Sequence, residues 1–140
     1  DKSVLERLDY PAATEPVQRL QQGSWRQKSY GDLSGSGFVI DCLEAALWCF
    51  WHTDNYADCV LAAANLGNDA DTTAAVAGQL AGACYGLSAI RDDWQQTLHQ
   101  GEAIQALADG LFELSLGSPT APEPSAISEP ARSLSAATTP

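Results

Sequence analysis

Methionine is absent from this sequence of 140 residues, and basic residues are few, with 7 Lys and Arg against 18 Asp and Glu. The net charge of −11 argues against a protein that binds nucleic acid, because phosphate backbones need a basic footprint, and against a polybasic membrane-surface protein. No uncharged apolar run is long enough to span a bilayer, and no basic segment followed by an apolar one opens the chain. Because not even an initiator methionine is present, we expect a piece of a longer protein.

A C-x-x-C pair is also missing, which argues against a zinc ribbon or a thioredoxin-type site. The four cysteines lie in stretches rich in Ala and Leu; they are Cys42, Cys49, Cys59 and Cys84. We interpret them as small buried hydrophobic residues of a reducing compartment, and we expect a cytoplasmic protein. A disulfide framework is the alternative.

The composition changes after Leu116. Residues 117–140 contain no aromatic side chain and five of the seven prolines, and most of the others are Ser, Thr, Ala and Glu. Such a segment buries too little apolar surface to offset the entropy of ordering it, so we predict a disordered tail over 117–140. The folded body is then 1–116.

The body is predicted to be helical. Apolar residues recur at three- and four-residue steps, which predicts helices over 16–22, 38–50, 56–66, 70–86 and 102–114. The Gly- and Ser-rich residues 23–37 are predicted to be a loop, and Val4 to Leu8 to be the last turn of a helix. Since no convincing period-two alternation appears, the predicted fold class is all-α. In the last helix we expect these residues to face inward: Ile104, Leu107, Ala108, Leu111 and Leu114.

The helix over 70–86 carries a stripe of small residues, since Ala74, Gly78, Gly82 and Gly86 lie four apart. Glycine inside a helix costs about 1 kcal/mol relative to Ala. Repeating that cost predicts that another helix or a ligand approaches closely along the stripe.

Acidic and hydroxyl side chains gather just before this helix and in its first turn, over 65–73 (NLGNDADTT). One interpretation is a set of helix caps, with the acids at the positive end of the helix dipole. The other is a site for Mg²⁺, Mn²⁺ or Ca²⁺, because these cations prefer carboxylate and hydroxyl oxygens. An EF-hand is excluded, because Ala74 and Leu80 stand where its Gly and Glu are required. Similarly, residues 34–37 (SGSG) before the helix over 38–50 are either a phosphate-binding turn or simply a flexible one.

The segments 35–50 (GSGFVIDCLEAALWCF) and 63–86 (AANLGNDADTTAAVAGQLAGACYG), and more loosely the region around Trp94, resemble the ADP-ribosylglycohydrolases. The resemblance implies a compact orthogonal multi-helix bundle with two Mg²⁺ or Mn²⁺ ions in a cleft. It implies that Asp69, Asp71 and Thr72 are metal ligands. It also implies that Ser36, Gly37 and Phe38 lie near the ADP-ribose.

The reaction implied by the resemblance is hydrolysis of the ribose C1″ bond of an ADP-ribosylated protein or a related ADP-ribose conjugate. The sequence departs from the family pattern at Phe38, where Tyr is common, and at Ile90-Arg91, where Ile-Pro is usual. It also lacks the Thr-Asp-Asp motif and the acidic residue of the family's N-terminal half. We therefore expect 1–116 to be a C-terminal portion whose catalytic residues lie in the missing N-terminal half, and which alone binds metal weakly and is inactive.

Two other hypotheses remain at this point. The chain could be a non-catalytic, crystallin-like relative that keeps the fold as a structural or binding module. It could also be a plain helical interaction domain whose acids only cap a helix.

Overall fold

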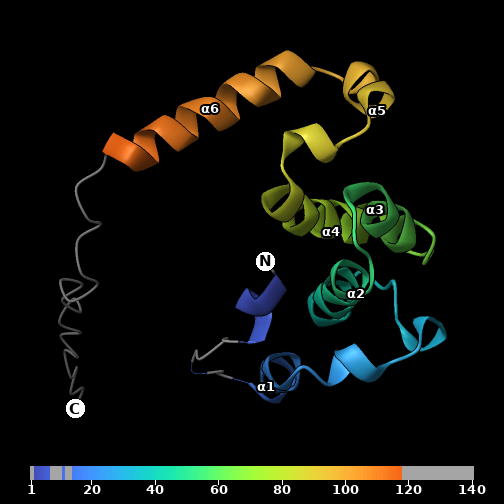
Figure 1. Ribbon diagram of the computed structural model, residues 1–140. Coiled ribbons are helices and arrows are strands. Elements are labelled where there is room, and N and C mark those ends of the chain that lie inside the picture. The colour runs from blue at the N-terminus through green and yellow to red at the C-terminus, as the bar shows by residue number, and fades with distance from the viewer. Residues whose placement is uncertain (1, 7–10, 12–13, 118–140) are drawn as a thin grey trace, which may run out of the picture. The chain divides into compact units, whose positions relative to one another are not determined.

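The computed structural model describes residues 2–6, 11 and 14–117, and none of these forms a β-strand (Figure 1). The prediction of an all-α fold is therefore confirmed. The α-helices are α1 (Glu15–Gln22), α2 (Val39–His52), α3 (Tyr56–Ala64), α4 (Ala70–Tyr85), α5 (Asp92–Thr97) and α6 (Gly101–Gly117). The predicted disordered tail lies, except for Gly117, outside the described residues, as does Leu8. Within the described ranges, no helix is both long and apolar enough to cross a membrane.

Residues up to Leu98 form one compact unit, and its core is built on α2, α3 and α4. Helix α3 packs along α4, and both helices contact α2. The core also takes in side chains from the segments before α2; its buried members are Leu5, Leu20, Trp25, Ala46, Leu47, Cys49, Phe50, Cys59, Ala63, Ala77 and Ala81. This core fixes the relative positions of the first turns of α2 and α4, where the candidate site lies.

The cysteines behave largely as predicted. Cys42, Cys49 and Cys59 are buried free thiols, and Cys84 is half-buried. Burial raises the pKa of the Cys49 thiol to about 12, because the charged thiolate would lose its hydration in the core.

The two central glycines of the small-residue stripe, Gly78 and Gly82, face α3. A Cβ atom at Gly78 would lie 3.3 Å from the Tyr56 hydroxyl oxygen, and one at Gly82 would lie 3.8 Å from Cε2 of the same ring. The prediction of a close approach is therefore confirmed, and the approaching element is a helix. Gly86 has another role, since it ends α4 with a positive φ of 80°.

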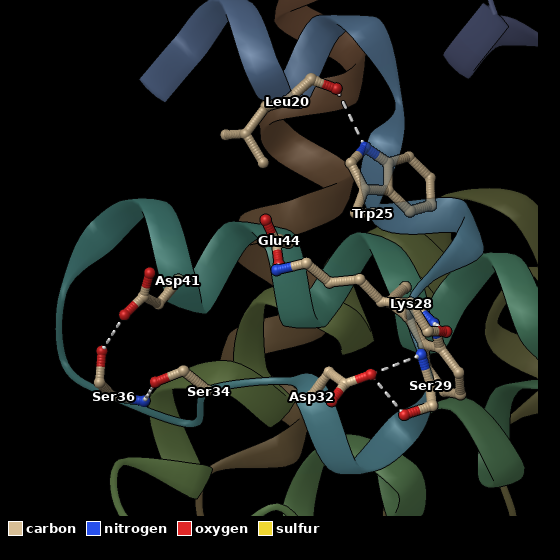
Figure 2. Close-up of polar contacts among 10 residues, drawn as sticks. Leu20, Trp25, Lys28, Ser29, Asp32, Ser34, Ser36, Asp41 and Glu44 are labelled. Atoms are coloured by element: carbon tan, nitrogen blue, oxygen red, sulfur yellow. Dashed lines mark hydrogen bonds and ion pairs between the residues drawn. The ribbon is translucent and has the colours of Figure 1, made fainter. Parts of the chain in front are cut away.

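The predicted loop over 23–37 is partly wrong, because it contains two 3-10 helices, η2 (Ser24–Gln27) and η3 (Tyr30–Asp32). Trp25 explains the first: its ring is buried, and its Nε1–H donates to the Leu20 carbonyl at 3.0 Å (Figure 2). In the second, Ser29 and Asp32 form a capping box. These turns anchor the chain before it reaches residues 34–37.

A second unit begins at His99, and α6 is its described helix. The expected inward face of α6 is wrong: the helix has no buried residue, and Leu107 is 70 % exposed. The apolar period is present, but a period only predicts which residues share a face. Burial also requires a second element, and the described part of this unit contains none.

Candidate functional site

The candidate site lies where the turn over 34–37 meets the residues that lead into α4. The backbone N–H of Asp69 donates to the Gly35 carbonyl at 2.9 Å. Gly35 is buried, and a Cβ atom there would lie only 2.5 Å from the Gly67 carbonyl oxygen. Two segments far apart in the sequence are thus joined by backbone contact, which any larger side chain at residue 35 would disturb.

The chain reaches Asp69 through two residues with positive φ, Gly67 at 75° and Asn68 at 55°. Asparagine tolerates this left-handed conformation better than most residues. The double turn brings the half-buried Asp69 side chain toward the turn: its Oδ2 would lie 3.1 Å from a Cβ atom at Gly37.

The Asp69 carboxylate does not act as a helix cap, although Asp69 stands at the N-cap position of α4. Its side chain accepts no backbone N–H of the helix. Instead, Oδ1 accepts a hydrogen bond from the Thr72 hydroxyl at 2.9 Å. Asp71 lies in the first turn of α4 and is exposed. The cap interpretation of the acidic segment therefore does not hold for the Asp69 side chain.

The residue types suit a hard divalent cation, since Asp69, Asp71 and Thr72 offer only carboxylate and hydroxyl oxygens. Their number does not complete such a site. Among the residues that the structure describes, no three His, Cys, Asp or Glu side chains are grouped closely enough to hold a metal ion. The chemistry of the three side chains therefore suits a divalent metal ion, but they can form only part of its coordination shell, and further ligands are needed.

Thr73 fixes the start of α4 from the core side. Its side chain is fully buried, and its hydroxyl lies 3.1 Å from the Asp69 carbonyl oxygen and 3.7 Å from the Cys42 sulfur on α2. A hydroxyl has one proton and can also accept, so it can satisfy both neighbours. Cys42 was not singled out from the sequence as part of the site, and Thr73 entered only as one of the hydroxyl residues of the segment 65–73.

The three residues predicted near substrate form the link into α2. The Ser36 hydroxyl donates to Asp41 Oδ2 at 2.7 Å (Figure 2). Its oxygen also lies 3.3 Å from the Phe38 nitrogen. The Phe38 side chain is 58 % exposed. Sequence reasoning missed Asp41; the available signal was an acidic residue in the first turn of a helix that follows a serine.

A cavity of about 160 Å³ also has Asp41 in its lining. It is lined by Pro16, Arg19, Ser24, Lys28, Ile40, Asp41 and Glu44. Lys28 and Glu44 form an ion pair across it (Figure 2). With two cationic and two anionic side chains in its lining, the cavity has no preference for a ligand of either charge.

Comparison with known proteins assigns the chain to a family. Residues 2–120 match the ADP-ribosylglycohydrolase family. The ADP-ribosylarginine hydrolase Tri1 of Serratia proteamaculans (strain 568) is 50% identical over 93 residues, which cover 66% of this chain and 25% of the relative. The protein of the same name from Pseudomonas putida (strain GB-1) is 47% identical over 94 residues, covering 67% and 25%.

A third relative is the ADP-ribosyl-dinitrogen reductase glycohydrolase of Rhodospirillum rubrum, which is 40% identical over 81 residues, covering 56% of this chain and 28% of the relative. The chain thus matches about a quarter of the length of these relatives. The family match covers more than half of the chain and confirms the resemblance read from its motifs. The chain belongs to the ADP-ribosylglycohydrolase family.

Proposed function

We propose that this chain forms one part of the active site of an ADP-ribosylglycohydrolase, which hydrolyses the ribose C1″ bond of ADP-ribosylated protein or a related ADP-ribose conjugate. One observation carries the proposal: the Asp69 N–H is bonded to the Gly35 carbonyl at 2.9 Å. The two segments expected at the site are therefore in direct contact. The names of the relatives, which are hydrolases of ADP-ribose conjugates, support the same reaction.

In this proposal, Asp69, Asp71 and Thr72 contribute ligands to Mg²⁺ or Mn²⁺. A bound divalent ion would supply Lewis-acid chemistry and a template for the ribose hydroxyls and the attacking water. The exposed carboxylate of Asp71 and the half-buried one of Asp69 supply negative charge on the solvent side of the turn. Gly37 leaves room beside Asp69, since any Cβ atom there would lie 3.1 Å from the carboxylate oxygen.

The turn over 34–37 and Phe38 would contact the ADP-ribose. Ser36 and Gly37 bring the backbone close to Asp69, and Phe38 offers an exposed ring to an apolar part of the ligand. Phe38 has no hydroxyl, so any contact that it makes with substrate is one of packing. The buried thiols Cys42, Cys49 and Cys59 favour a reducing compartment such as the cytoplasm for the reaction.

The remaining ligands and the catalytic residues are proposed to come from the N-terminal half of the family domain. Three ligands from one segment cannot fill two octahedral coordination shells. The chain alone is therefore expected to bind Mg²⁺ or Mn²⁺ weakly and to hydrolyse nothing. Calorimetric titration of the 140-residue chain with Mn²⁺ checks this, and binding in the micromolar range would refute the idea of a partial site.

A hybrid protein tests the proposed reaction. In it, this chain replaces the matching segment of the Serratia proteamaculans relative, and the assay follows release of ADP-ribose from ADP-ribosylarginine. We expect the hybrid to be active and Asp71→Asn to reduce turnover at least about a hundredfold, because the exchange removes a proposed metal ligand. Asp92→Asn is the matched control, since Asp92 is also an exposed acid in the first turn of a helix, α5. Equal turnover in the two variants would refute the proposal.

One observation favours a second candidate, a non-catalytic module. The described residues contain no group of three His, Cys, Asp or Glu side chains able to hold a metal by themselves. A correctly folded hybrid that binds ADP-ribose and has no measurable turnover, even with Mn²⁺ in excess, would favour that candidate over the hydrolase.

A further inference from the structure

The link into α2 lacks the side chain that normally caps a helix. Its N-cap residue is Phe38, which cannot accept a hydrogen bond from the first backbone N–H groups. Ser36, two residues earlier, bonds instead to the N-cap residue itself. Its hydroxyl oxygen accepts from the Phe38 N–H at 3.3 Å, and its proton is donated to Asp41 Oδ2 at 2.7 Å.

This arrangement is a capping box with one group inserted. In the usual box, an acidic side chain at the third helical position accepts the N–H of the N-cap residue directly. Asp41 is the third residue of α2, but here the Ser36 hydroxyl lies between its carboxylate and the Phe38 N–H. The chain of bonds thus runs from Phe38 through Ser36 to Asp41. Because one end is a carboxylate, the bond from Ser36 is charge-assisted and stronger than a neutral one.

The same turn is held on its other side by the residues before α4. Gly35 accepts from the Asp69 N–H, and Gly37 lies against the Asp69 carboxylate. Asp41 therefore holds the turn on α2, while Asp69 holds it on α4. Without the bond to Asp41, the Ser36 hydroxyl would keep only its 3.3 Å contact with the Phe38 N–H, so the exposed Phe38 ring and Gly37 beside Asp69 would be held less firmly.

We propose that Asp41 is a positioning residue for the turn over 36–38: it acts through the Ser36 hydroxyl and sets the conformation in which Gly37 and Phe38 meet ADP-ribose. The conformational part stands on the hydrogen bonds alone. The part that concerns ADP-ribose rests on the proposed function. Asp41 itself does not touch the substrate.

Solvent-exchange NMR of the 140-residue chain tests the conformational part. In Asp41→Ala and in Ser36→Ala, the Phe38 amide should exchange about tenfold faster than in the wild type, the factor expected for loss of one charge-assisted hydrogen bond. Asp41→Asn should be intermediate, because its amide oxygen still accepts, and Ser36→Thr should be close to the wild type. The double variant should exchange no faster than Ser36→Ala, since both changes break the same chain of bonds.

Glu44→Ala is the matched control for this experiment. Glu44 lies one turn further along α2 and pairs with Lys28 rather than with the turn. Unchanged exchange at Phe38 in Asp41→Ala would overturn the proposal. So would equal acceleration in Glu44→Ala, because the effect would then be a general loosening of α2.

ADP-ribose affinity in the hybrid protein tests the second part. The dissociation constant should rise about tenfold in Asp41→Ala, less in Asp41→Asn, and not in Glu44→Ala, while the thermal unfolding temperatures of Asp41→Asn and the wild type stay close. If the dissociation constants do not follow this order of variants while the amide exchange does, Asp41 positions the turn, but the turn does not contribute to ADP-ribose binding. If the wild-type hybrid binds no ADP-ribose, the proposed function fails, and the amide exchange still decides the role of Asp41.

Discussion

The contact between the turn and α4 can be tested by one methyl group, in the variant Gly35→Ala. The added Cβ atom would lie 2.5 Å from the Gly67 carbonyl oxygen and 3.3 Å from Cβ of Leu66. The nearer neighbour is a backbone atom, so no rotation of a side chain relieves the clash. Gly35 does not have a positive φ, so an effect of the exchange reports this contact and not a forbidden backbone conformation.

The expected cost follows from two contributions. Overpacking a well-filled site costs about 1–3 kcal/mol. Moving the segments apart also weakens the hydrogen bond from the Asp69 N–H to the Gly35 carbonyl, which contributes about 1 kcal/mol. Gly35→Ala should therefore lower the free energy of unfolding by about 2–4 kcal/mol, a large share of the stability of a small domain.

Urea unfolding of the 140-residue chain, followed by circular dichroism and tryptophan fluorescence, measures this change. At a slope of about 2 kcal/mol per M, the midpoint should fall by about 1–2 M. Gly31→Ala is the matched control, because a Cβ atom at Gly31 has no neighbour within 4 Å and Gly31 also lacks a positive φ. It should be neutral or stabilising by a few tenths of a kcal/mol. Equal midpoints in the two variants would refute the close contact of the two segments.

Two further predictions concern the core and α6. The free energy of unfolding should fall as the pH rises from 9 toward 12, by up to about 1.4 kcal/mol per pH unit. The reason is that an unfolded Cys49 ionises near 9.0, while burial keeps the folded thiol protonated to about 12. Urea titrations along this pH series should show a shallower fall in Cys49→Ala, and parallel curves for the variant and the wild type would contradict the raised pKa of Cys49. The double exchange Leu107→Gln and Leu111→Gln on α6 should change the free energy of unfolding by less than about 0.5 kcal/mol, since both side chains are exposed. Leu47→Ala in the core should instead cost about 2–5 kcal/mol. A comparable loss in the α6 variant would show that the apolar face of α6 is covered in solution.

Helices α1, α2, α3, α4 and α6 were predictable because their signals are local, whereas the short α5 (Asp92–Thr97) was not predicted. Apolar spacing predicted α2, α3 and α4. The glycines at 78 and 82 predicted a close approach by another helix or a ligand, and the structure has a helix there. The 3-10 helix over Ser24–Gln27 was not predictable in the same way. It depends on Trp25 finding a buried position and a carbonyl partner on Leu20, and neither is visible from spacing within a Gly- and Ser-rich stretch.

The prediction for α6 was wrong although the local signal of this helix is clear. Its period is strong, and a strong period was taken to mean burial. In this chain the apolar residues of α6 remain exposed because no described residue of their unit covers them. An amphipathic pattern records what a helix can bury, and it does not record whether the partner belongs to the same chain.

In the candidate site, too, some residues have a local sequence signal and others do not. The family resemblance implied roles for Asp69, Asp71 and Thr72, and for Ser36, Gly37 and Phe38, and these roles stay predictions. Asp41 could not be predicted in this way, because its role depends on a hydroxyl that reaches past the N-cap residue of α2. Similarly, nothing in the spacing predicted that Thr73, directly after Thr72, would be buried against Cys42.

The geometry at Asp69 also bears on the choice between a helix cap and a functional site. A capping carboxylate is satisfied by the backbone N–H groups of its own helix, and its position is the outcome of that interaction. Asp69 accepts none of them; its oxygens are directed to the Thr72 hydroxyl and to the open position at Gly37. The chain reaches this arrangement through a left-handed Asn68, a conformation that is uncommon outside glycine. A strained approach that leaves α4 without a side-chain cap is a local disadvantage for folding. It supports the proposal that the Asp69 carboxylate is positioned for a ligand rather than for the helix.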